Sequence, residues 1–323
     1  MRTPEFWQRD SLWSWLLAPA GWLYAVAGWW RWRRARPVRA PVPVVCVGNL
    51  VAGGAGKTPT VLALADLLRD RTPHALSRGY GGRLSGVVRV DPARHSAEDV
   101  GDEPLLLARH LPAWISRDRP AGARAAAEAG AGLILMDDGF QNPTLAKTVS
   151  LLVIDAAQGL GNGRCLPAGP LREPAARGFA RADAVVLIGE GSPALPFAGP
   201  VFHAHVRPLA AGASWRGRAV VAFAGIARPE KLFATLRTLG ADLRSTQAFA
   251  DHHRFQDTEL QALARVAGSD AVLVTTEKDH VRLPADWQKR VEPLPVALQF
   301  EDPAALTAWL TTRLASARLE AAP

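Results

Sequence analysis

A glycine-rich stretch, VAGGAGKTPT at residues 51–60, has the residue types of a loop that binds phosphate through its backbone. Its glycines would let several backbone N–H groups turn toward one anion, and the N-terminus of a following helix favours negative charge. Lys57 would reach the β- and γ-phosphates of a nucleotide, and Thr58 would offer its hydroxyl to Mg²⁺. The residues expected to surround the phosphates are Val51, Ala52, Gly53, Gly54, Ala55, Gly56, Lys57 and Thr58.

One residue departs from the usual pattern G-x-x-x-x-G-K-[ST], which has glycine at the position of Val51. That first glycine mainly eases a turn, so valine weakens the match without removing a phosphate contact. The lysine supports a phosphate site, because the chain has 33 arginines and only five lysines, and a compact ammonium group suits phosphate. The alternative is a glycine-rich turn that binds no ligand.

Two acidic pairs could supply the metal ligands and the base that phosphoryl transfer requires. Asp137 and Asp138 end the apolar run LILMDD, as the aspartate of a Walker B strand does, and Asp102 and Glu103 begin a predicted helix. Taken alone, each pair is better explained as a turn or a helix cap. A phosphate loop in the same predicted sheet favours the functional interpretation of both pairs.

A third polar group, in the stretch FADHHRF, follows a predicted strand further along the chain. It contains Asp251, His252 and His253. A single histidine in such a place is usually structural. The adjacent acidic residue and the position directly after a strand make this group a candidate for the site.

The elements that must position these residues alternate between strand and helix from residue 41 onward. Several strand candidates are continuous apolar runs, which is typical of parallel strands buried on both faces. They lie at residues 41–50, 73–80, 87–91, 113–116, 133–138, 149–155 and 184–189, with helices predicted at 58–68, 102–111 and 121–130. This order predicts a doubly wound α/β sheet of the P-loop NTPase-like kind.

A second series of strands and helices begins after a stretch rich in Gly, Ala and Ser at residues 207–218. We therefore expect three parts. These are a membrane-associating helical segment at 1–40, a P-loop nucleotide-binding domain at 41–212, and a second, smaller α/β domain at 213–323. The last helix of the chain could instead pack back on the first domain.

The first 40 residues combine apolar and basic character. Residues 11–30 carry no charge, seven of the eleven tryptophans lie within the first 32 residues, and residues 1–40 hold +5 of the chain's +8. Anionic lipid is therefore the expected partner of this segment, and the small charge elsewhere argues against nucleic acid. Pro19, Gly21 and the tryptophans favour one or two helices in the membrane interface over a spanning helix.

Seven motifs follow one another along residues 41–279: PVPVVCVGNLVAGGAGKTP, SRGYGG, GDEP, DDGFQN, LPAGPLREP, FADHH and TEKD. In this order they resemble the tetraacyldisaccharide 4′-kinase family, the lipid A kinases of Gram-negative bacteria. The family also has a residue other than glycine at the position of Val51, and a tryptophan-rich start is typical of it. One departure is Asn142, where the family usually has histidine; asparagine cannot titrate, so no proton-handling role is expected there.

The resemblance implies that the chain transfers the γ-phosphate of ATP, with Mg²⁺, to the 4′-hydroxyl of an acylated glucosamine disaccharide 1-phosphate. It also implies a P-loop core joined by a hinge to a second α/β domain, docked at the cytoplasmic face of the bacterial inner membrane. The two cysteines, Cys46 and Cys165, match no metal spacing and fit such a reducing compartment.

The resemblance also implies roles for individual residues. Lys57 and Thr58 would hold phosphate and Mg²⁺, and Asp102 would be the base, paired with His252. The metal shell and the polar site around it would comprise Thr58, Glu103, Asp137, Asp138 and Gln141. The phosphate and sugars of the acceptor would be bound by Arg78, Tyr80, Arg119 and Arg172.

The main alternative is a membrane-bound nucleotide switch of the partitioning or division-site kind, which also has a GGxGKT loop and a membrane helix. Those ATPases usually carry a second lysine before the glycine pair, where this chain has Ala52, and their membrane helix is generally at the other end. ATP consumption that requires a sugar-lipid acceptor would distinguish a kinase from such a switch.

Overall fold

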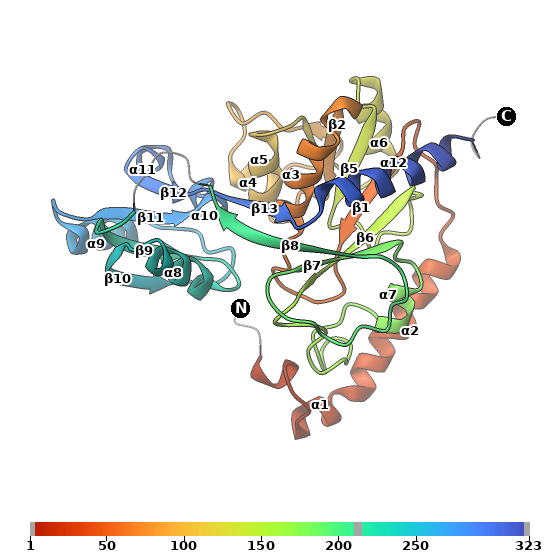
Figure 1. The fold of residues 1–323 in the computed structure, drawn as a ribbon, viewed down its shortest axis with the longest axis horizontal. Coiled ribbons are helices and arrows are strands. Elements are labelled where there is room, and N and C mark those ends of the chain that lie inside the picture. Colours follow the sequence, from red (N-terminus) through yellow and green to blue (C-terminus); the bar gives the residue numbers. More distant parts are fainter. Residues whose placement is uncertain (1–3, 210–214, 320–323) are drawn as a thin grey trace.

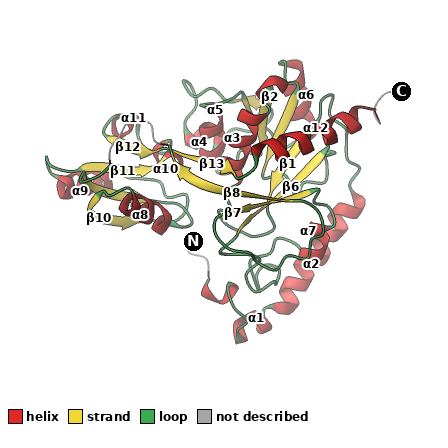
Figure 2. Cartoon of the chain, viewed as in Figure 1, coloured by secondary structure: helices red, strands yellow, loops and turns green. Residues whose placement is uncertain are grey.

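The computed structural model describes residues 4–209 and 215–319, which form two lobes, each built on its own β-sheet (Figure 1). The larger sheet has nine strands and the smaller sheet has four. Helices pack against both sheets (Figure 2). The predicted α/β fold with a parallel sheet is therefore confirmed.

The strands of the larger sheet are parallel except at its two edges. In spatial order they are β13 (Val296–Phe300), β8 (Val201–Pro208), β7 (Ala184–Ile188), β6 (Val149–Asp155), β1 (Val44–Gly48), β5 (Leu133–Asp137), β2 (Pro73–Ser77), β4 (Ala113–Ile115) and β3 (Val88–Arg89). At the edges, β13 is antiparallel to β8 and β3 is antiparallel to β4. The central strands β1, β5 and β6 are buried along their whole length, which explains their continuous apolar sequences.

Two layers of helices cover the larger sheet, because alternate residues of each strand face opposite sides. The helices of this lobe are α3 (Lys57–Leu67), α4 (Ala97–Val100), α5 (Asp102–Ala108), α6 (Arg119–Glu128), α7 (Ala175–Phe179) and α12 (Pro303–Leu319), with a short 3₁₀ helix, η2 (Arg69–Arg71). Val45 and Val47 of β1 face the core under α3, α5 and α12, whereas Val44 and Cys46 face the core under α6 and α7. The arrangement is doubly wound, with helices on both faces.

The smaller sheet is parallel throughout, in the order β10-β9-β11-β12. Its strands are β9 (Ala219–Ala224), β10 (Asp242–Ala248), β11 (Val272–Thr276) and β12 (Val291–Leu294), and its helices are α8 (Pro229–Thr238), α9 (Asp257–Ala267), α10 (Glu277–His280) and α11 (Ala285–Gln288). Leu232 and Leu236 of α8 pack in one apolar cluster of the lobe, and Leu260 and Leu263 of α9 pack in another. This lobe therefore has a core of its own.

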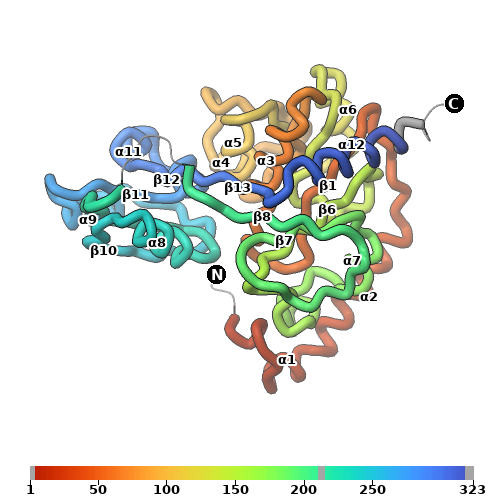
Figure 3. Tube along the Cα trace, in the orientation of Figure 1, coloured from red at the N-terminus to blue at the C-terminus, as the bar shows by residue number. Residues whose placement is uncertain are grey.

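The chain passes between the lobes twice. β8 leads from the larger sheet toward the smaller lobe, and β13 returns beside it as an antiparallel partner (Figure 3). α12 then packs on the larger sheet, where Leu306, Leu310 and Leu314 are buried. The predicted second domain, residues 213–323, thus includes two elements that belong to the larger sheet and its helical layer. The predicted start of that domain lies outside the described residues.

The N-terminal segment forms η1 (Glu5–Trp7), α1 (Leu12–Leu16) and α2 (Ala18–Arg34) along the outside of the larger lobe. Gly21 of α2 faces this lobe, where an added Cβ would lie 2.8 Å from the Cys165 carbonyl oxygen. Most large apolar side chains of the two helices are exposed: Leu12, Trp13, Trp15, Leu16, Trp22, Leu23, Tyr24, Val26, Trp29 and Trp30. No helix within residues 4–209 and 215–319 is both long and apolar enough to cross a membrane.

Candidate active site

The glycine-rich loop connects β1 to α3, so it lies at the C-terminal edge of the larger sheet. Gly53 and Gly56 have φ angles of 118° and 86°, which residues with side chains rarely adopt. A Cβ at Gly56 would also lie 2.6 Å from Ile188 Cδ1. Gly56 directly precedes α3, and Lys57 is the first residue of the helix. The loop therefore needs glycine at these positions, and its N–H groups lead into a helix N-terminus.

Val51 has a structural role that glycine could not fill. Its side chain is buried, with 4 % exposed, and its backbone bridges Leu171. The next residue, Ala52, donates its N–H to the Pro170 carbonyl oxygen at 2.8 Å. The side-chain amide of Asn49 donates to the Val51 carbonyl oxygen, also at 2.8 Å. Backbone contacts therefore join the base of the loop to the segment around Leu171, and the Val51 side chain packs in the same apolar cluster as Leu171.

Replacing Val51 with glycine, which restores the usual loop pattern, should lower stability. The change removes a buried isopropyl group and adds backbone freedom, which together cost about 2–3 kcal/mol in the free energy of unfolding. Urea denaturation of the Val51→Gly and Val51→Ala proteins measures this cost and separates the side-chain part from the backbone part. Equal stability of the wild type and both variants would show that the packing of Val51 contributes nothing.

Lys57 and Thr58 each meet one of the two adjacent aspartates at the end of β5. Thr58 donates its hydroxyl to Asp137 Oδ2 at 3.1 Å, and Lys57 Nζ lies 3.7 Å from Asp138 Oδ1. Arg172 donates to the same oxygen of Asp138 at 2.7 Å. These contacts are possible because β1 and β5 are neighbouring parallel strands, so the residues that follow them meet at one edge of the sheet.

Asp137 is a buried carboxylate with one unused oxygen. It is 2 % exposed, and its Oδ1 has no hydrogen-bond partner among the described residues. Burial, together with the negative charge of Glu103, raises the pKa of Asp137 to about 7. A cation nearby would stabilise the ionised form of such a carboxylate. In the described parts of the chain, no three histidine, cysteine or acidic side chains form a group that could hold a metal ion.

Asp102 and Glu103 face the smaller lobe, and three basic side chains of that lobe reach them. His252 Nδ1 lies 2.9 Å from Asp102 Oδ2, and Lys278 Nζ lies 3.0 Å from Glu103 Oε1. Arg282 Nε is 3.6 Å from Asp102 Oδ2. Asp102 and His252 are 150 residues apart in the sequence, so it is the docking of the two lobes that brings them together.

These basic neighbours hold Asp102 in its ionised form. Burial by itself would raise the pKa of Asp102, but the hydrogen bond with His252 and the charges of Lys278 and Arg282 outweigh it. Its pKa is consequently well below the ordinary value of an aspartate. Asp102 is therefore available as an acceptor for the hydrogen of a hydroxyl group.

Two residues of the site have backbones in the left-handed region. Asp138 has a φ of 50° and His252 a φ of 58°, and Thr72 is the third such residue, glycines apart, in the described chain. The His252 N–H is fixed by a hydrogen bond of 3.0 Å to the Gly225 carbonyl oxygen. Side chains disfavour this conformation, and it persists where the surrounding structure imposes it, most often at functional sites.

The residues predicted to bind the acceptor differ in exposure. Tyr80 is exposed beside His252, with ring centroids 6.1 Å apart, and Arg78 is exposed on the same loop. Arg119 is instead 3 % exposed and donates to the Ser77 carbonyl oxygen at 2.9 Å. Burial, assisted by the charge of Arg78, lowers the pKa of Arg119 to about 10. Arg119 is therefore a buried residue that holds the end of β2 through its hydrogen bond to Ser77.

Gln141 lies at the base of the loop. Its side-chain amide donates to the Asn49 carbonyl oxygen at 2.9 Å and to Glu173 Oε1 at 3.0 Å. Glu173 also accepts two hydrogen bonds from Arg181, at 2.6 and 2.7 Å. These contacts give Gln141 a role in holding the loop, and its predicted place in the polar site around a metal ion stays a prediction.

Three residues in contact with the site were not predicted. Glu173 lies in the motif LPAGPLREP, and Lys278 lies in TEKD, but neither motif by itself indicates a partner. Arg282 is hydrogen-bonded to Asp279 in the smaller lobe and gives no sequence signal. The sequence could have drawn attention to Lys278, because the chain has only five lysines. The same rarity of lysine supported the prediction for Lys57.

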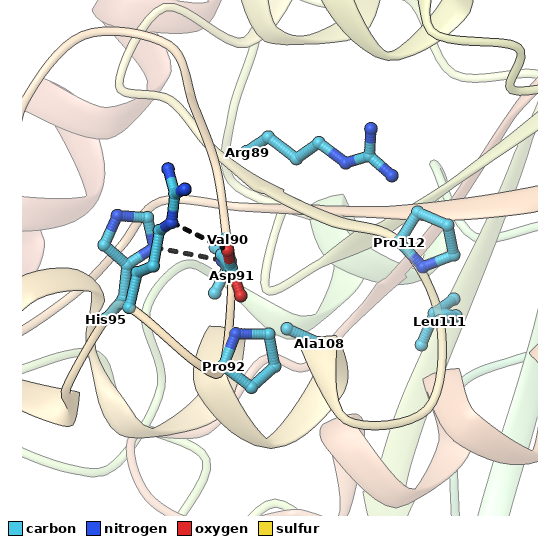
Figure 4. Close-up of a pocket in the computed structure, with 9 residues that line it drawn as sticks. Arg89, Val90, Asp91, Pro92, His95, Ala108, Leu111 and Pro112 are labelled. Atoms are coloured by element: carbon cyan, nitrogen blue, oxygen red, sulfur yellow. Dashed lines mark hydrogen bonds and ion pairs between the residues drawn. The ribbon is translucent and has the colours of Figure 1, made fainter.

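A cavity of about 340 Å³ lies between the glycine-rich loop and the smaller lobe. Gly53 and Gly54 contribute to its lining from the loop, and Ala227 and Arg228 contribute from the turn before α8. A second cavity of about 600 Å³ lies beside β3, at the opposite end of α5 from Asp102. Figure 4 shows the residues that line it. It is lined by Arg89, Val90, Asp91, Pro92, Arg94, His95, Ala108, Leu111 and Pro112. Only the first cavity adjoins the candidate site.

The fold and the site together define an ATP-dependent kinase of the α/β class. A glycine-rich loop presents a lysine and a threonine to two aspartates of a neighbouring strand, and a second lobe delivers a histidine to a further carboxylate. Residues 13–315 match the family described as Tetraacyldisaccharide-1-P 4′-kinase. The chain belongs to this family.

Individual members of the family are similar to this sequence along nearly its whole length. The sequence is 56 % identical over 316 residues to the Tetraacyldisaccharide 4′-kinase of Rhodospirillum centenum, covering 94 % of each chain. It is 51 % identical over 332 residues to that of Rhodospirillum rubrum, covering 99 % of each chain. The structure is similar to a crystal structure of LpxK from Aquifex aeolicus in complex with ATP, with a TM-score of 0.80, 29 % identity, and coverage of 93 % of this chain and 99 % of that chain. The predicted family is confirmed.

Proposed function

We propose that this chain transfers the γ-phosphate of ATP to the 4′-hydroxyl of an acylated glucosamine disaccharide 1-phosphate, in lipid A biosynthesis. The observation that carries the proposal is the meeting of Asp102 with His252 at the same edge of the sheet as Lys57 and Thr58. Family membership supports the choice of acceptor and of the position that is phosphorylated. The reaction would take place at the cytoplasmic face of the bacterial inner membrane.

The loop would bind the triphosphate of ATP. Backbone N–H groups at Gly54 and Gly56 would donate to phosphate oxygens, and the Lys57 ammonium group would balance charge that develops during transfer. The cavity of about 340 Å³ beside Gly53 and Gly54 has room for part of a nucleotide, which supports this assignment.

Mg²⁺ would bind beside Thr58, Asp137 and Glu103. Two properties of Asp137 favour a cation at this point. Its Oδ1 has no hydrogen-bond partner among the described residues, and burial and the charge of Glu103 raise its pKa. Mg²⁺ in such sites usually takes one or two carboxylates and completes its shell with phosphate and water, which agrees with the few protein ligands. When bound, the ion would neutralise charge on the phosphate groups. Gln141 would complete the polar site with its side-chain oxygen, because its amide N–H groups donate to Asn49 and Glu173.

Asp102 would accept the proton of the 4′-hydroxyl as the new bond to phosphorus forms. His252, 2.9 Å away, would orient the carboxylate and stabilise its working protonation state. Because His252 belongs to the smaller lobe, the site would be complete only when the lobes are docked. Docking after both substrates bind would limit hydrolysis of ATP in the absence of acceptor.

The acceptor would approach across Arg78, Tyr80 and Arg172. Arginine side chains suit the phosphate of the acceptor because they donate two parallel hydrogen bonds, and the phenol of Tyr80 can bond to a sugar hydroxyl. The exposure of Arg78 and Tyr80 supports this direction of approach. Arg119 would act indirectly, by holding the end of the strand that precedes Arg78.

The exposed apolar side of α1 and α2 would bind the membrane interface through anionic lipid. Trp13, Trp15 and Trp22 are 64, 63 and 67 % exposed, and exposed apolar patches of this kind mark interaction sites. Arg34 lies over Trp30, with its guanidinium carbon 3.4 Å from the ring centroid, which places a cation next to the apolar surface. Such a combination is typical of helices that lie in the interface of an anionic bilayer.

Replacing Trp13, Trp15 and Trp22 together with serine should release the protein from vesicles of phosphatidylethanolamine and phosphatidylglycerol. Losing three interfacial indole rings should weaken the binding on the order of 10²-fold, since each ring no longer leaves water. Co-sedimentation with the vesicles measures the change. Val266→Ser, which removes an exposed apolar side chain from the smaller lobe, is the control. Unchanged sedimentation of the triple variant would mean that another surface binds the lipid.

The proposed reaction is tested with the disaccharide 1-phosphate, ATP and Mg²⁺. We expect mass spectrometry to find a product with one additional phosphate at the 4′-position, and ADP to form only when the acceptor is present. ATP hydrolysis that is indifferent to the acceptor, with no phosphorylated lipid, would refute the kinase and favour a membrane-bound nucleotide switch.

A further inference from the structure

Lys278 belongs to the smaller lobe, yet its ammonium group contacts the larger one. It lies in α10, directly after β11, and its side chain is 24 % exposed. Its Nζ is 3.0 Å from Glu103 Oε1 and 3.7 Å from Asp102 Oδ2. Among the described residues, these are the partners of its ammonium group in hydrogen bonds and ion pairs. In the described parts of the chain, the Lys278 side chain therefore has no hydrogen bond or ion pair within its own lobe.

Arg282 differs from Lys278 in this respect. Its guanidinium donates to the Gly225 carbonyl oxygen at 2.9 Å and to the His253 carbonyl oxygen at 3.2 Å, and it is paired with Asp279. These bonds fix Arg282 within the smaller lobe, whether or not that lobe is docked. Of these two residues, Lys278 is thus the one whose side-chain polar contacts depend on docking.

Four carboxylates line this edge of the larger sheet: Asp102, Glu103, Asp137 and Asp138. In the part of the chain that the structure describes, the basic residues of the larger lobe that pair with them, Lys57 and Arg172, both pair with Asp138. The cations that pair with Asp102 and Glu103 come from the smaller lobe. Before docking, the Asp102–Glu103 pair would therefore lack a positively charged side chain among the described residues.

Without the lysine, Glu103 would disfavour the reaction on electrostatic grounds, because the Mg²⁺ proposed at this site is shared with Asp137 and the phosphates. The charge of Glu103 already acts on the buried carboxylate of Asp137, and it would also repel the terminal phosphate of a nucleotide held by the nearby loop. An ammonium group at 3.0 Å cancels much of that repulsion and fixes the direction of the carboxylate. Lysine suits this position because one compact charge can serve two neighbouring carboxylates.

We propose that Lys278 is a positioning residue for phosphoryl transfer, which orients Glu103 and balances its charge when the smaller lobe docks. The inference rests on the proposed kinase function and deepens it. His252 forms a hydrogen bond with Asp102, and Lys278 forms a separate one with Glu103. Docking therefore gives each member of the acidic pair a basic partner. Lys278 would act through Glu103, without touching the substrates.

The first test is steady-state kinetics of Lys278→Met, which removes the charge and keeps the length of the side chain. We expect kcat to fall about tenfold, as is usual when a residue supporting a site is removed, with little change in KM for ATP or acceptor. Lys289→Met is the matched control, because Lys289 is an exposed lysine of the same lobe. Wild-type kcat in Lys278→Met would overturn the inference.

The second test does not depend on activity or on Mg²⁺. Spin labels at Arg124→Cys in α6 and Val266→Cys in α9, with Cys165 replaced by alanine, report the distance between the lobes. In nucleotide-free protein without Mg²⁺, Lys278→Met and Glu103→Gln should each shift the distribution toward longer distances, and the double variant should shift it no further. Additive shifts, or no shift in either single variant, would overturn a docking contact between these two side chains.

The two tests also separate this inference from the function on which it rests. A wild-type protein that phosphorylates no acceptor, but whose label distances respond as described, would refute the kinase and retain the contact. A wild-type protein that is active, with Lys278→Met equal to it in kcat and in label distances, would retain the kinase and refute the role of Lys278.

Discussion

Lys57→Ala should reduce the turnover of acceptor on the order of 10³-fold, since it removes the cation that we propose balances charge on the transferred phosphoryl group. Lys57 is the first residue of α3, at the end of the glycine-rich loop, and its ammonium group lies 3.7 Å from Asp138. Asp138 keeps its closer partner Arg172, at 2.7 Å, so the variant should fold normally. The loss should therefore appear in the rate and leave the stability nearly unchanged.

Two further variants sharpen this prediction. Lys57→Arg should also be poorly active, because a planar guanidinium is bulkier than an ammonium group and presents its donors in a different geometry. Lys289→Ala, which removes an exposed lysine charge from the smaller lobe, should behave as the wild type. Single-turnover phosphorylation of the disaccharide 1-phosphate measures the rates, and thermal unfolding measures stability. Near-normal rates in folded Lys57→Ala protein would exclude the glycine-rich loop as the phosphate site.

The second large effect concerns the pair formed by Asp102 and His252. Asp102→Asn and His252→Ala should each lower turnover by about 10²- to 10³-fold while nucleotide binding stays largely intact, since both changes affect proton transfer. The double variant should be only slightly worse than the poorer single variant, because groups that act as one unit are not additive. The hydrogen bond of 2.9 Å between the two side chains is the physical reason for this coupling.

The choice of substitution matters for this pair. Asp102 is buried against Lys278 and Arg282, so alanine would remove a carboxylate that both cations contact and would leave a space between the lobes. Asparagine keeps the shape of the side chain and an oxygen that can accept a hydrogen bond. Calorimetric titration with ATP separates binding from chemistry. Losses that multiply fully in the double variant would show that Asp102 and His252 act independently.

The sequence by itself determined the α/β class, the order of most strands and helices, and the family. Parallel strands that are buried on both faces have continuous apolar sequences, as in β5 and β6. Such a pattern can be recognised locally, because its residues are close together in the chain. The same local information placed the glycine-rich loop after β1 and the Asp137–Asp138 pair at the end of β5. Because the C-terminal ends of neighbouring parallel strands share one edge, the order of strands and loops is enough to predict a contact between the loop and the aspartates.

Tertiary structure alone decided how distant segments meet. β8 and β13 lie about 90 residues apart in the chain, and nothing local in either strand specifies that they pair in the larger sheet. The contact of Val51 with Leu171, the burial of Arg119 and the reach of Lys278 to Glu103 are of the same kind. Local periodicity reports which face of an element is buried, but a contact between lobes depends on the relative placement of two independently packed cores, which no local pattern encodes.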